Sequence, residues 1–440
     1  MERKLSVYPP PRERRASVFF QTAFTVRPDR LVSATGPEDV RTAVRYAAEH
    51  GLSVTVTSTG HGLGGTVEGG VLIDTRAMDG VEVDPVARTA RIGAGARWGQ
   101  VAEAAAPYGL APLNGSSPGV GVVGYLLGGG LGILGRTYGW AADRVRAVEL
   151  VTADGAVRRL VPGDAAFGAL LGGGAVHRFG VVTEVTVDLV PVARLYGGSL
   201  AFDGAVVDPA EVLRGYVRWA EALPATLTSS LAALVYPDVP ALPPHLRGRY
   251  VLSVRVACTG ASGNSAEGER LVAPLRALGP ALSDSLRELP YSESPTIHAD
   301  PDVPHAYWGD GILLDVMDEG AVTEVLRLTG PEAGRMVVVQ LNHLGGALAA
   351  EGPASVPYRE AGWLVRALYP LDETGEAGVA PVRELHARVE AALAPRTLGR
   401  AVNFVFGDRE RTEGLYDPET AKRLAAVESE LDPANLFGRG

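Results

Sequence analysis

One histidine of the chain, His61, stands between two glycines, and a stretch dense in glycine follows from Gly115 to Gly132. Glycine has no side chain, so backbone rich in it can approach a ring or a phosphate closely. The histidine would add a nucleophilic ring nitrogen to such a backbone cradle. This pairing of residue types predicts a site that holds a flat cofactor.

The segment Gly119 to Gly124 also matches the G-x-G-x-x-G pattern of dinucleotide-binding proteins, and Asp143 follows at about the twenty-residue distance that this pattern requires. Its context does not fit, because loop-forming residues from Asn114 to Pro118 precede it where a strand is needed. A glycine triplet, Gly128 to Gly130, follows where a helix should begin. Since apolar residues interleave with the glycines, the run fits a buried segment pressed against a ligand better than a Rossmann turn or a linker.

Composition limits the possible partners. A chain of 440 residues with 46% hydrophobic and 21% charged residues is expected to form two or three globular domains. The net charge of −10, without a long basic run, argues against a nucleic acid or an anionic membrane as partner. The single cysteine, Cys258, excludes an internal disulfide and a cysteine-based metal site, and no metal is expected. It falls in an apolar strand, which predicts a place in the core.

The sequence shows no targeting feature. Its first residues carry charges and prolines where an export signal needs an apolar stretch. No segment offers the roughly 18 consecutive apolar residues of a membrane-spanning helix. A cytoplasmic protein is therefore expected.

The first part of the chain alternates strand and helix patterns, which are expected to position the histidine. Residues 31–34 and 52–57 are predicted as strands, and the second leads to His61. Between them, Pro37 beside two acidic residues predicts a helix start, and Gly51 predicts its end. Further strands are expected at residues 70–74, 89–92, 145–151, 156–160 and 181–190, with a helix at residues 97–106.

From about Arg194 the pattern changes. Strands such as residues 250–257 and 336–341 alternate with helices such as residues 211–223 and 321–328. This order predicts an antiparallel sheet covered on one face by helices. A last helix is expected at residues 418–431.

Several motifs in order resemble the berberine-bridge-enzyme-like branch of the vanillyl-alcohol-oxidase superfamily of flavoproteins. The resemblance covers residues 27–192, 336–347 and 401–437. The motifs that carry it are the flavin-linking loop Thr59 to Gly62, the second signature Gly128 to Gly132 with Tyr138, Gly139 and Asp143, the third signature Phe179 to Thr183, and Asn403 with Asp432, Pro433 and Asn435 near the C-terminus.

The resemblance implies an α+β fold in which a PCMH-type FAD-binding domain of two α+β subdomains (27–192) follows an N-terminal arm (1–26). A substrate domain (193–395) and a berberine-bridge-like C-terminal segment (396–440) that returns to the FAD domain complete the chain. FAD would lie between the two subdomains, joined through a ring nitrogen of His61 to its 8α-methyl group. The residues placed at the cofactor are Ser58, Thr59, Gly60, His61, Gly62, Leu63, Gly64, Ser117, Pro118, Val120, Gly121, Gly124, Tyr125, Gly128, Gly129, Gly130, Gly132, Asp143, Gly180, Val181, Val182 and Asn403.

Three features bear on the chemistry, of which two depart from the family pattern and one matches it. Many members form a second covalent bond through a cysteine, and Ser117 stands at this position here, so a single covalent link is predicted. Val120 matches the position that controls the approach of oxygen in the family, and valine there is associated with oxidase behaviour. An insertion in the third signature contains His177 and Arg178, which are expected to be surface-loop residues.

Ala401 and Phe404 replace tyrosines that often flank the C-terminal asparagine in the family, so the catalytic residues have to be sought elsewhere. Gln340 and Asn342 share one face of the strand at residues 336–341 and could point at the flavin. An amide is nevertheless a poor general base.

Tyr125, expected beside the pyrimidine edge of the flavin, joins Gln340 and Asn342 as the candidate catalytic residues. Tyr307 and His343 are further candidates, for which a structural role is favoured.

The resemblance implies an FAD-dependent oxidoreductase that transfers a hydride from a C–H bond bearing an alcohol or amine to flavin N5, with O₂ as the expected acceptor. The expected substrate is a natural-product-type small molecule, and the protein is expected to be a monomer or homodimer. Two alternatives stay open: a flavoprotein that catalyses a redox-neutral cyclisation or rearrangement, and a non-catalytic protein that keeps flavin as a structural element.

Overall fold

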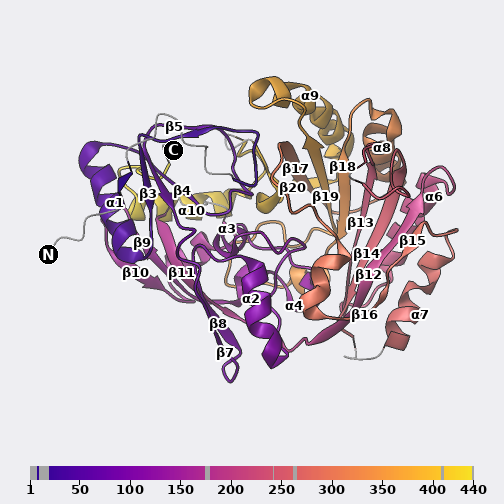
Figure 1. Ribbon diagram of the computed structural model, residues 1–440, viewed down its shortest axis with the longest axis horizontal. Helices are drawn as coiled ribbons and strands as arrows, with labels where there is room; N and C mark the ends of the chain where they lie inside the picture. Colours follow the sequence, from indigo (N-terminus) through magenta and orange to yellow (C-terminus); the bar gives the residue numbers. More distant parts are fainter. Residues whose placement is uncertain are drawn as a thin grey trace.

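The structure is a computed structural model that describes residues 7–8, 19–173, 179–240, 242–260, 265–407 and 411–438. Its elements form two lobes that lie side by side (Figure 1). The presence of both helices and sheets in each lobe confirms the predicted α+β class. The insertion with His177 and Arg178 lies outside the described residues.

The first lobe contains two main sheets. In the smaller sheet, of order β1-β3-β6-β4, the strands β3, β6 and β4 run parallel. In the larger sheet, of order β10-β9-β11-β8-β7, all neighbours are antiparallel, and β2 pairs separately with β5. The strands of the first lobe are β1 (Val7–Tyr8), β2 (Val26–Arg27), β3 (Arg30–Ser33), β4 (Val54–Thr57), β5 (Val67–Glu68), β6 (Val71–Asp74), β7 (Val81–Asp84), β8 (Thr89–Gly93), β9 (Val145–Val151), β10 (Val157–Leu160) and β11 (Val181–Asp188).

The predicted helix after the first strand is confirmed as α1 (Pro37–His50). The carboxylate of Asp39 accepts hydrogen bonds from the backbone and the hydroxyl of Thr35, which fixes the entry of the chain. Gly51 ends the helix at φ 64°, where its N–H donates to carbonyls of the last turn. The other helices of this lobe are α2 (Trp98–Ala105), α3 (Val122–Leu127), α4 (Gly135–Tyr138) and α5 (Ala165–Leu170).

The glycine-dense run begins as a loop, as expected, and this excludes a Rossmann turn there. The loop is tied to the start of α2 because the N–H groups of Trp98 and Gly99 donate to the carbonyls of Val120 and Pro118, at 3.1 and 2.9 Å. The short helix α3 then follows and ends directly before the glycine triplet. The sequence alone did not predict this helix.

The second lobe is a nine-stranded antiparallel sheet of order β15-β12-β14-β13-β18-β19-β17-β20, with β16 paired to β12. The predicted antiparallel sheet with helices on one face is thus confirmed, and Figure 1 shows these helices on its outer side. The strands are β12 (Arg194–Asp203), β13 (Leu227–Val235), β14 (Tyr250–Cys258), β15 (Ser283–Asp284), β16 (Arg287–Pro290), β17 (Tyr307–Leu314), β18 (Val338–His343), β19 (Trp363–Pro370) and β20 (Thr397–Arg400). The helices are α6 (Pro209–Glu221), α7 (Ser265–Arg276), α8 (Glu319–Thr329) and α9 (Glu376–Leu393). Among the described residues, no helix has the length and apolar character to cross a membrane.

The two faces of the large sheet have different partners. Val254, Val339 and Val365 pack into one core with the helices, and Cys258 is buried there, as predicted. The side chains that alternate with these residues point away from the helices. Leu364 on this other side packs into the core of the first lobe. We call it the helix-free face.

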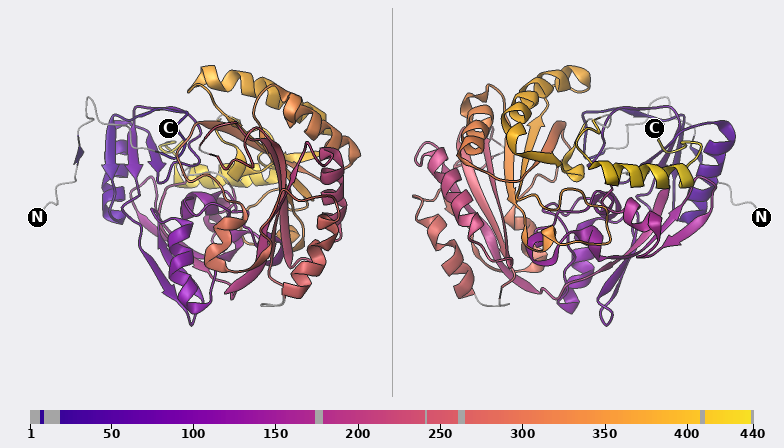
Figure 2. Two further views of the ribbon diagram at one scale, coloured as in Figure 1. Left: turned by 45° about the vertical axis from the view of Figure 1, so that its right-hand side comes forward. Right: turned by 180° about the vertical axis from the view of Figure 1, so that it is seen from behind.

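The C-terminal part of the chain returns to the first lobe. Figure 2 shows α10 (Pro418–Leu431) lying across that lobe. Leu424 and Phe437 are buried in its core, and the N–H of Val54 in β4 donates to the carbonyl of Leu436 at 2.9 Å. The predicted domain boundaries at residues 26, 192 and 395 stay predictions.

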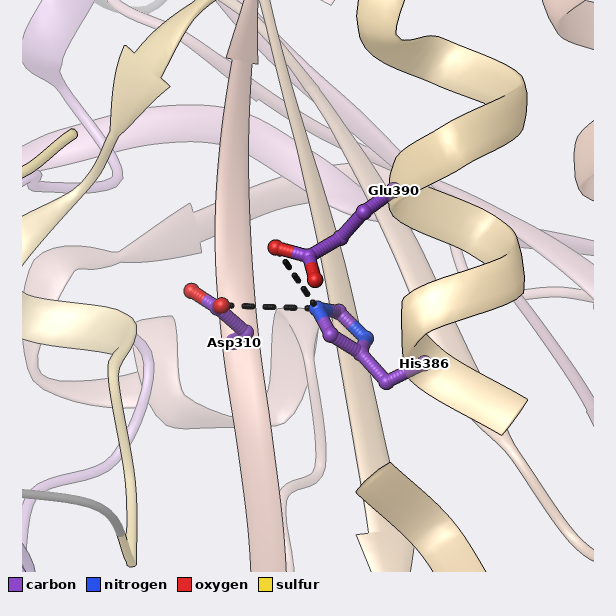
Figure 3. A group of neighbouring side chains, drawn as sticks. All are labelled: Asp310, His386 and Glu390. Carbon is purple, nitrogen blue, oxygen red and sulfur yellow. Dashed lines mark ion pairs between the residues drawn. The ribbon is translucent and has the colours of Figure 1, made fainter. Parts of the chain in front are cut away.

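A buried charge network joins the helix layer to the C-terminal segment. Asp310 of β17 lies 3.3 Å from Nε2 of His386 in α9, and Glu390 lies one turn further along that helix (Figure 3). These three side chains are close enough to hold a metal ion. However, Arg400 and Arg411 both form ion pairs with the carboxylates of Asp310 and Glu390. A cation would have to displace two guanidinium groups, so the cluster is better described as an ion-pair network.

Burial alone would raise the pKa of Asp310, but His386, Arg400 and Arg411 outweigh it and hold this pKa below its ordinary value of 3.8. The ion pairs of Asp310 therefore stabilise the fold above pH 3.8, and this stability is lost as the pH falls below that value.

We expect Asp310→Asn to lower the free energy of unfolding by about 3–5 kcal/mol at pH 7, because it removes the fully buried carboxylate of the network and leaves Glu390 as the one carboxylate shown to pair with both Arg400 and Arg411. Urea unfolding should show this loss, and the gap to the wild type should narrow below pH 3.8. Glu82→Gln removes an exposed partner of Arg91 and should cost less than about 1 kcal/mol. Equal effects of the two substitutions would contradict the assignment.

Candidate functional site

His61 lies directly after β4, in the loop that the sequence predicted. Its Nδ1 is 3.0 Å from the hydroxyl of Thr59, and its ring stacks on Phe20 with centroids 3.8 Å apart. Its Nε2 is buried and has no hydrogen-bond partner in the described part of the chain. A buried polar atom without a partner is costly, so this nitrogen points to a group that the protein is built to receive.

The imidazole of His61 is neutral at physiological pH. Burial, with smaller contributions from Arg97 and His305, lowers its pKa from 6.5 to about 4. A neutral ring keeps one nitrogen lone pair free for attack on an electrophile. The environment thus gives His61 the protonation state that a covalent linkage requires.

Glycines occur on both sides of this loop, and Gly119 is the one that lies beside the ring. A Cβ at Gly119 would lie 3.6 Å from Cε1 of His61 and 3.8 Å from the hydroxyl oxygen of Ser117. These two predicted cofactor residues therefore lie on the same side of Gly119. Gly60 has φ 75°, and a Cβ there would collide with Phe19 at 2.5 Å. The hydroxyl of Ser58, in the same loop, is buried and has no hydrogen-bond partner in the described ranges.

The N-terminal arm fastens this loop to the second lobe. Backbone N–H groups of Phe20 and Gln21 donate to Thr59 and Gly60, while Phe20 and Thr22 form backbone hydrogen bonds with His305. The hydroxyl of Tyr307 in β17 donates to the carbonyl of His61 at 2.6 Å. Tyr307, a further catalytic candidate from the sequence, therefore has a positioning contact here.

The helix-free face turns a group of polar side chains toward the first lobe. Across neighbouring strands, Ser230 pairs in register with Arg255 and Asn342, and Gln340 pairs with Arg366. Buried atoms of this face without a hydrogen-bond partner among the described residues are Oγ of Ser230, Nε2 of Gln340, Oδ1 of Asn342 and Nε of Arg366. The face thus offers both donors and acceptors to a polar ligand.

A loop after the short helix at Tyr291–Ile297 adds His298 and Asp300 to this region. The hydroxyl of Ser116, in the glycine-dense run, donates to the carboxylate of Asp300. Burial lowers the pKa of His298 to about 3, with Arg255 contributing, and Nδ1 of His298 has no partner in the described structure. Residues from both lobes therefore meet at this place.

The structure brings Gln340 and Asn342 together but places Tyr125 elsewhere. The hydroxyl of Tyr125 donates to the carbonyl of Leu113 at 3.1 Å, and its ring packs edge-on against Trp98 in the first lobe. Burial raises the pKa of Tyr125 well above 10.0. These contacts give no support to the catalytic role predicted for Tyr125.

Asn403 and Asp143 also have partners within the protein. Nδ2 of Asn403 donates to the carbonyl of Tyr125 at 3.0 Å, and its side chain lies against Gly128. Both carboxylate oxygens of Asp143 accept hydrogen bonds from Arg359 at 2.8 Å. Asp143 thereby anchors a loop of the second lobe, and its predicted contact with the cofactor is untested.

Four further predicted residues, namely His343, Gly180, Val181 and Val182, have contacts within the protein. His343 lies 3.2 Å from Nη1 of Arg136, and burial with this guanidinium lowers its pKa to about 3. A Cβ at Gly180 would meet the carbonyl of Val151 at 2.5 Å, so the third signature needs glycine for packing at the start of β11. Val181 and Val182 are buried in the core there.

The comparisons with known proteins agree with this geometry. Residues 28–161 match the family described as FAD binding domain. The (R)-6-hydroxynicotine oxidase of Paenarthrobacter nicotinovorans is 32% identical over 93% of this chain and 90% of its own length. The crystal structure of 6-hydroxy-D-nicotine oxidase from Arthrobacter nicotinovorans superimposes with a TM-score of 0.80 at 26% identity, over 99% of this chain and 96% of that one. Berberine-bridge-enzyme-like protein 1 of Physcomitrella patens shares the fold, with a TM-score of 0.80 at 20% identity over 96% and 92% of the two chains.

The chain belongs to the berberine-bridge-enzyme-like family of FAD-linked oxidoreductases. It is therefore an FAD-dependent oxidoreductase, which confirms the cofactor and the class of enzyme predicted from the sequence. The site fits FAD: Gly119 lies beside a histidine nitrogen that has no hydrogen-bond partner among the described residues, and the second lobe adds buried polar atoms that likewise lack a partner there.

The sequence analysis did not predict four residues of the candidate site. Arg255 and Arg366 each stand in a strand between apolar residues, and the alternation that singled out Gln340 could have found them. His298 and Asp300 lie in a proline-rich joint that carries no periodic signal. Only the fold brings them beside the sheet.

We expect Gly128→Ala to reduce the flavin content of the purified protein, because the new methyl group would overlap the amide of Asn403 and break its bond to Tyr125. The ratio of flavin to protein absorbance measures this, and the overlap should also cost about 1–3 kcal/mol of stability. Gly80→Ala places a methyl group in open space and serves as the control. A normal flavin content and stability in Gly128→Ala would refute the proposed packing.

Proposed function

We propose that this protein is an oxidase with FAD linked covalently through His61, and that it oxidises a C–H bond bearing an alcohol or amine in a natural-product-type small molecule. O₂ is the proposed acceptor. The observation that carries the proposal is the neutral imidazole of His61, whose buried Nε2 lies beside Gly119 and has no hydrogen-bond partner among the described residues.

The relatives support the oxidase assignment. The (R)-6-hydroxynicotine oxidase covers nearly the whole chain, and its name describes oxidation of a small nitrogen-containing molecule. The carbohydrate oxidase of Microdochium nivale shares the fold with a TM-score of 0.81 at 20% identity. Small-molecule substrates thus fit the family. We propose that side chains of the helix-free face select the substrate in this protein.

The bound flavin would supply the redox chemistry, accepting a hydride at N5. The protein then has to hold the cofactor, orient the substrate and exclude water. The loop at His61 is held by Tyr307 and the N-terminal arm, which fixes the ring from one side. Within the described structure, Nε2 of Gln340 and Oδ1 of Asn342 are a donor and an acceptor without partners, which suits them to orient a substrate hydroxyl or amine.

Ser117 lies near Gly119, as His61 does, but a serine cannot form a thioether. One covalent link is therefore proposed. A cytoplasmic location and a monomeric or dimeric state remain predictions from the sequence.

We expect His61→Ala to release its flavin on acid precipitation, since the only proposed attachment is gone, whereas the wild-type precipitate should stay yellow. Ser117→Ala, beside the same glycine, should also keep its colour and serves as the matched control. Peptide mapping by mass spectrometry should find flavin on the peptide that contains His61. A yellow precipitate from His61→Ala would contradict the linkage.

The proposed acceptor predicts that chemically reduced protein is reoxidised by air with release of peroxide. Val120→Ile should slow this step about five- to tenfold, because crowding by one methylene costs on the order of 1 kcal/mol. Val86→Ile makes the same change at a residue that is 93% exposed and should leave the rate unaltered. Stopped-flow absorbance of the flavin measures both rates. Failure of the wild-type protein to react with oxygen would reject the oxidase assignment.

A further inference from the structure

Two arginines stand on the helix-free face on either side of the polar pair Gln340 and Asn342. Arg255 lies on β14 and Arg366 on β19, and strands β13 and β18 run between them. Arg366 is directly opposite Gln340, and its Nη1 donates to Oε1 of that amide at 3.2 Å. Both guanidinium groups are therefore part of the surface that faces the flavin-binding lobe.

Neither arginine forms an ion pair within 4.0 Å in the described ranges of the chain. Arg366 lies over the ring of Phe404, with Cζ 4.0 Å from its centroid, and its buried Nε has no hydrogen-bond partner among the residues that the structure describes. This differs from Arg400 and Arg411, which are fully engaged with carboxylates on the other face of the same sheet. Burying a charge without a counter-charge is costly.

The local charges do not balance. Arg255 and Arg366 each carry one positive charge, and Asp300 is the carboxylate that acts on both. Asp300 keeps exposed surface, and burial by itself would raise its pKa, but its neighbours His298 and Arg255 lower it, so it stays ionised. His298 between them is neutral. One positive charge is left over, and burial lowers the pKa of Arg366 to about 10.

We propose that the substrate of this oxidoreductase carries a carboxylate, and that Arg366 binds it, with Nε2 of Gln340 as a second donor and Arg255 as a second positive charge. The guanidinium group matches a carboxylate because it presents paired N–H donors in one plane. The unpartnered Nε of Arg366 and Nε2 of Gln340 supply such donors on adjacent strands. This inference rests on the proposed function, since it places the acid group of the substrate on the helix-free face, which is turned toward the flavin-binding lobe.

Benzoate and benzamide test the inference without knowledge of the natural substrate, because they differ in charge but hardly in shape. Isothermal calorimetry on the flavin-loaded protein should show benzoate binding at least about tenfold more tightly than benzamide. Arg366→Gln should weaken benzoate binding about 10- to 100-fold and leave benzamide binding unchanged. Arg327→Gln removes a positive charge paired with Glu324 on the helix side and should change neither.

Equal binding of the two probes by the wild-type protein, or no benzoate binding, would overturn the inference even if the variant failed to fold. Unchanged benzoate binding in a folded Arg366→Gln protein would do the same. In either case an acid-stable flavin and reoxidation by oxygen would leave the proposed function standing. Calorimetry also remains valid if the flavin proves to be bound without a covalent link.

Discussion

The arrangement of the site depends on the docking of the His61 loop against β17 of the large sheet. The hydroxyl of Tyr307 donates to the carbonyl of His61, and the backbone of Phe20 and Gln21 pairs with the loop on its other side. These bonds join three segments that are distant in the sequence. They fix the imidazole relative to the helix-free face, so a cofactor held at His61 would necessarily face the polar side chains of the second lobe.

The two faces of the large sheet differ in whether their charged side chains form ion pairs. On the helix side, Asp310 and Glu390 are matched by Arg400 and Arg411, and the network ties the C-terminal segment to α9. On the helix-free side, Arg366 has no carboxylate partner in the described parts of the chain, and several buried polar atoms have no hydrogen bond there. A buried charge that is paired is compatible with a stable fold, whereas an unpaired one lowers the free energy of unfolding unless a ligand supplies the opposite charge. The same sheet thus provides a structural network and a binding surface.

Local sequence signals predicted the elements near the histidine well. The proline and acidic residues before α1 and the glycine after it act through short-range capping, and the structure has this helix where expected. The alternation of Gln340 and Asn342 with apolar residues also predicted correctly that they share one face. The role given to Tyr125 received no support, because its ring turns into the core of the first lobe and its hydroxyl binds Leu113. A motif gives the position of a side chain along the chain and leaves its direction open.

The sequence by itself determined the family, the FAD cofactor, the α+β class and the histidine in its glycine setting, since these follow from residue types at short spacing. Only the tertiary structure decided which charges are paired. Arg255, His298 and Arg366 come from separate strands and a loop, and their proximity follows from strand order and from the docking of two lobes. Pairing between distant segments depends on how backbone hydrogen bonds and core packing are satisfied over the whole chain, and no local pattern records it.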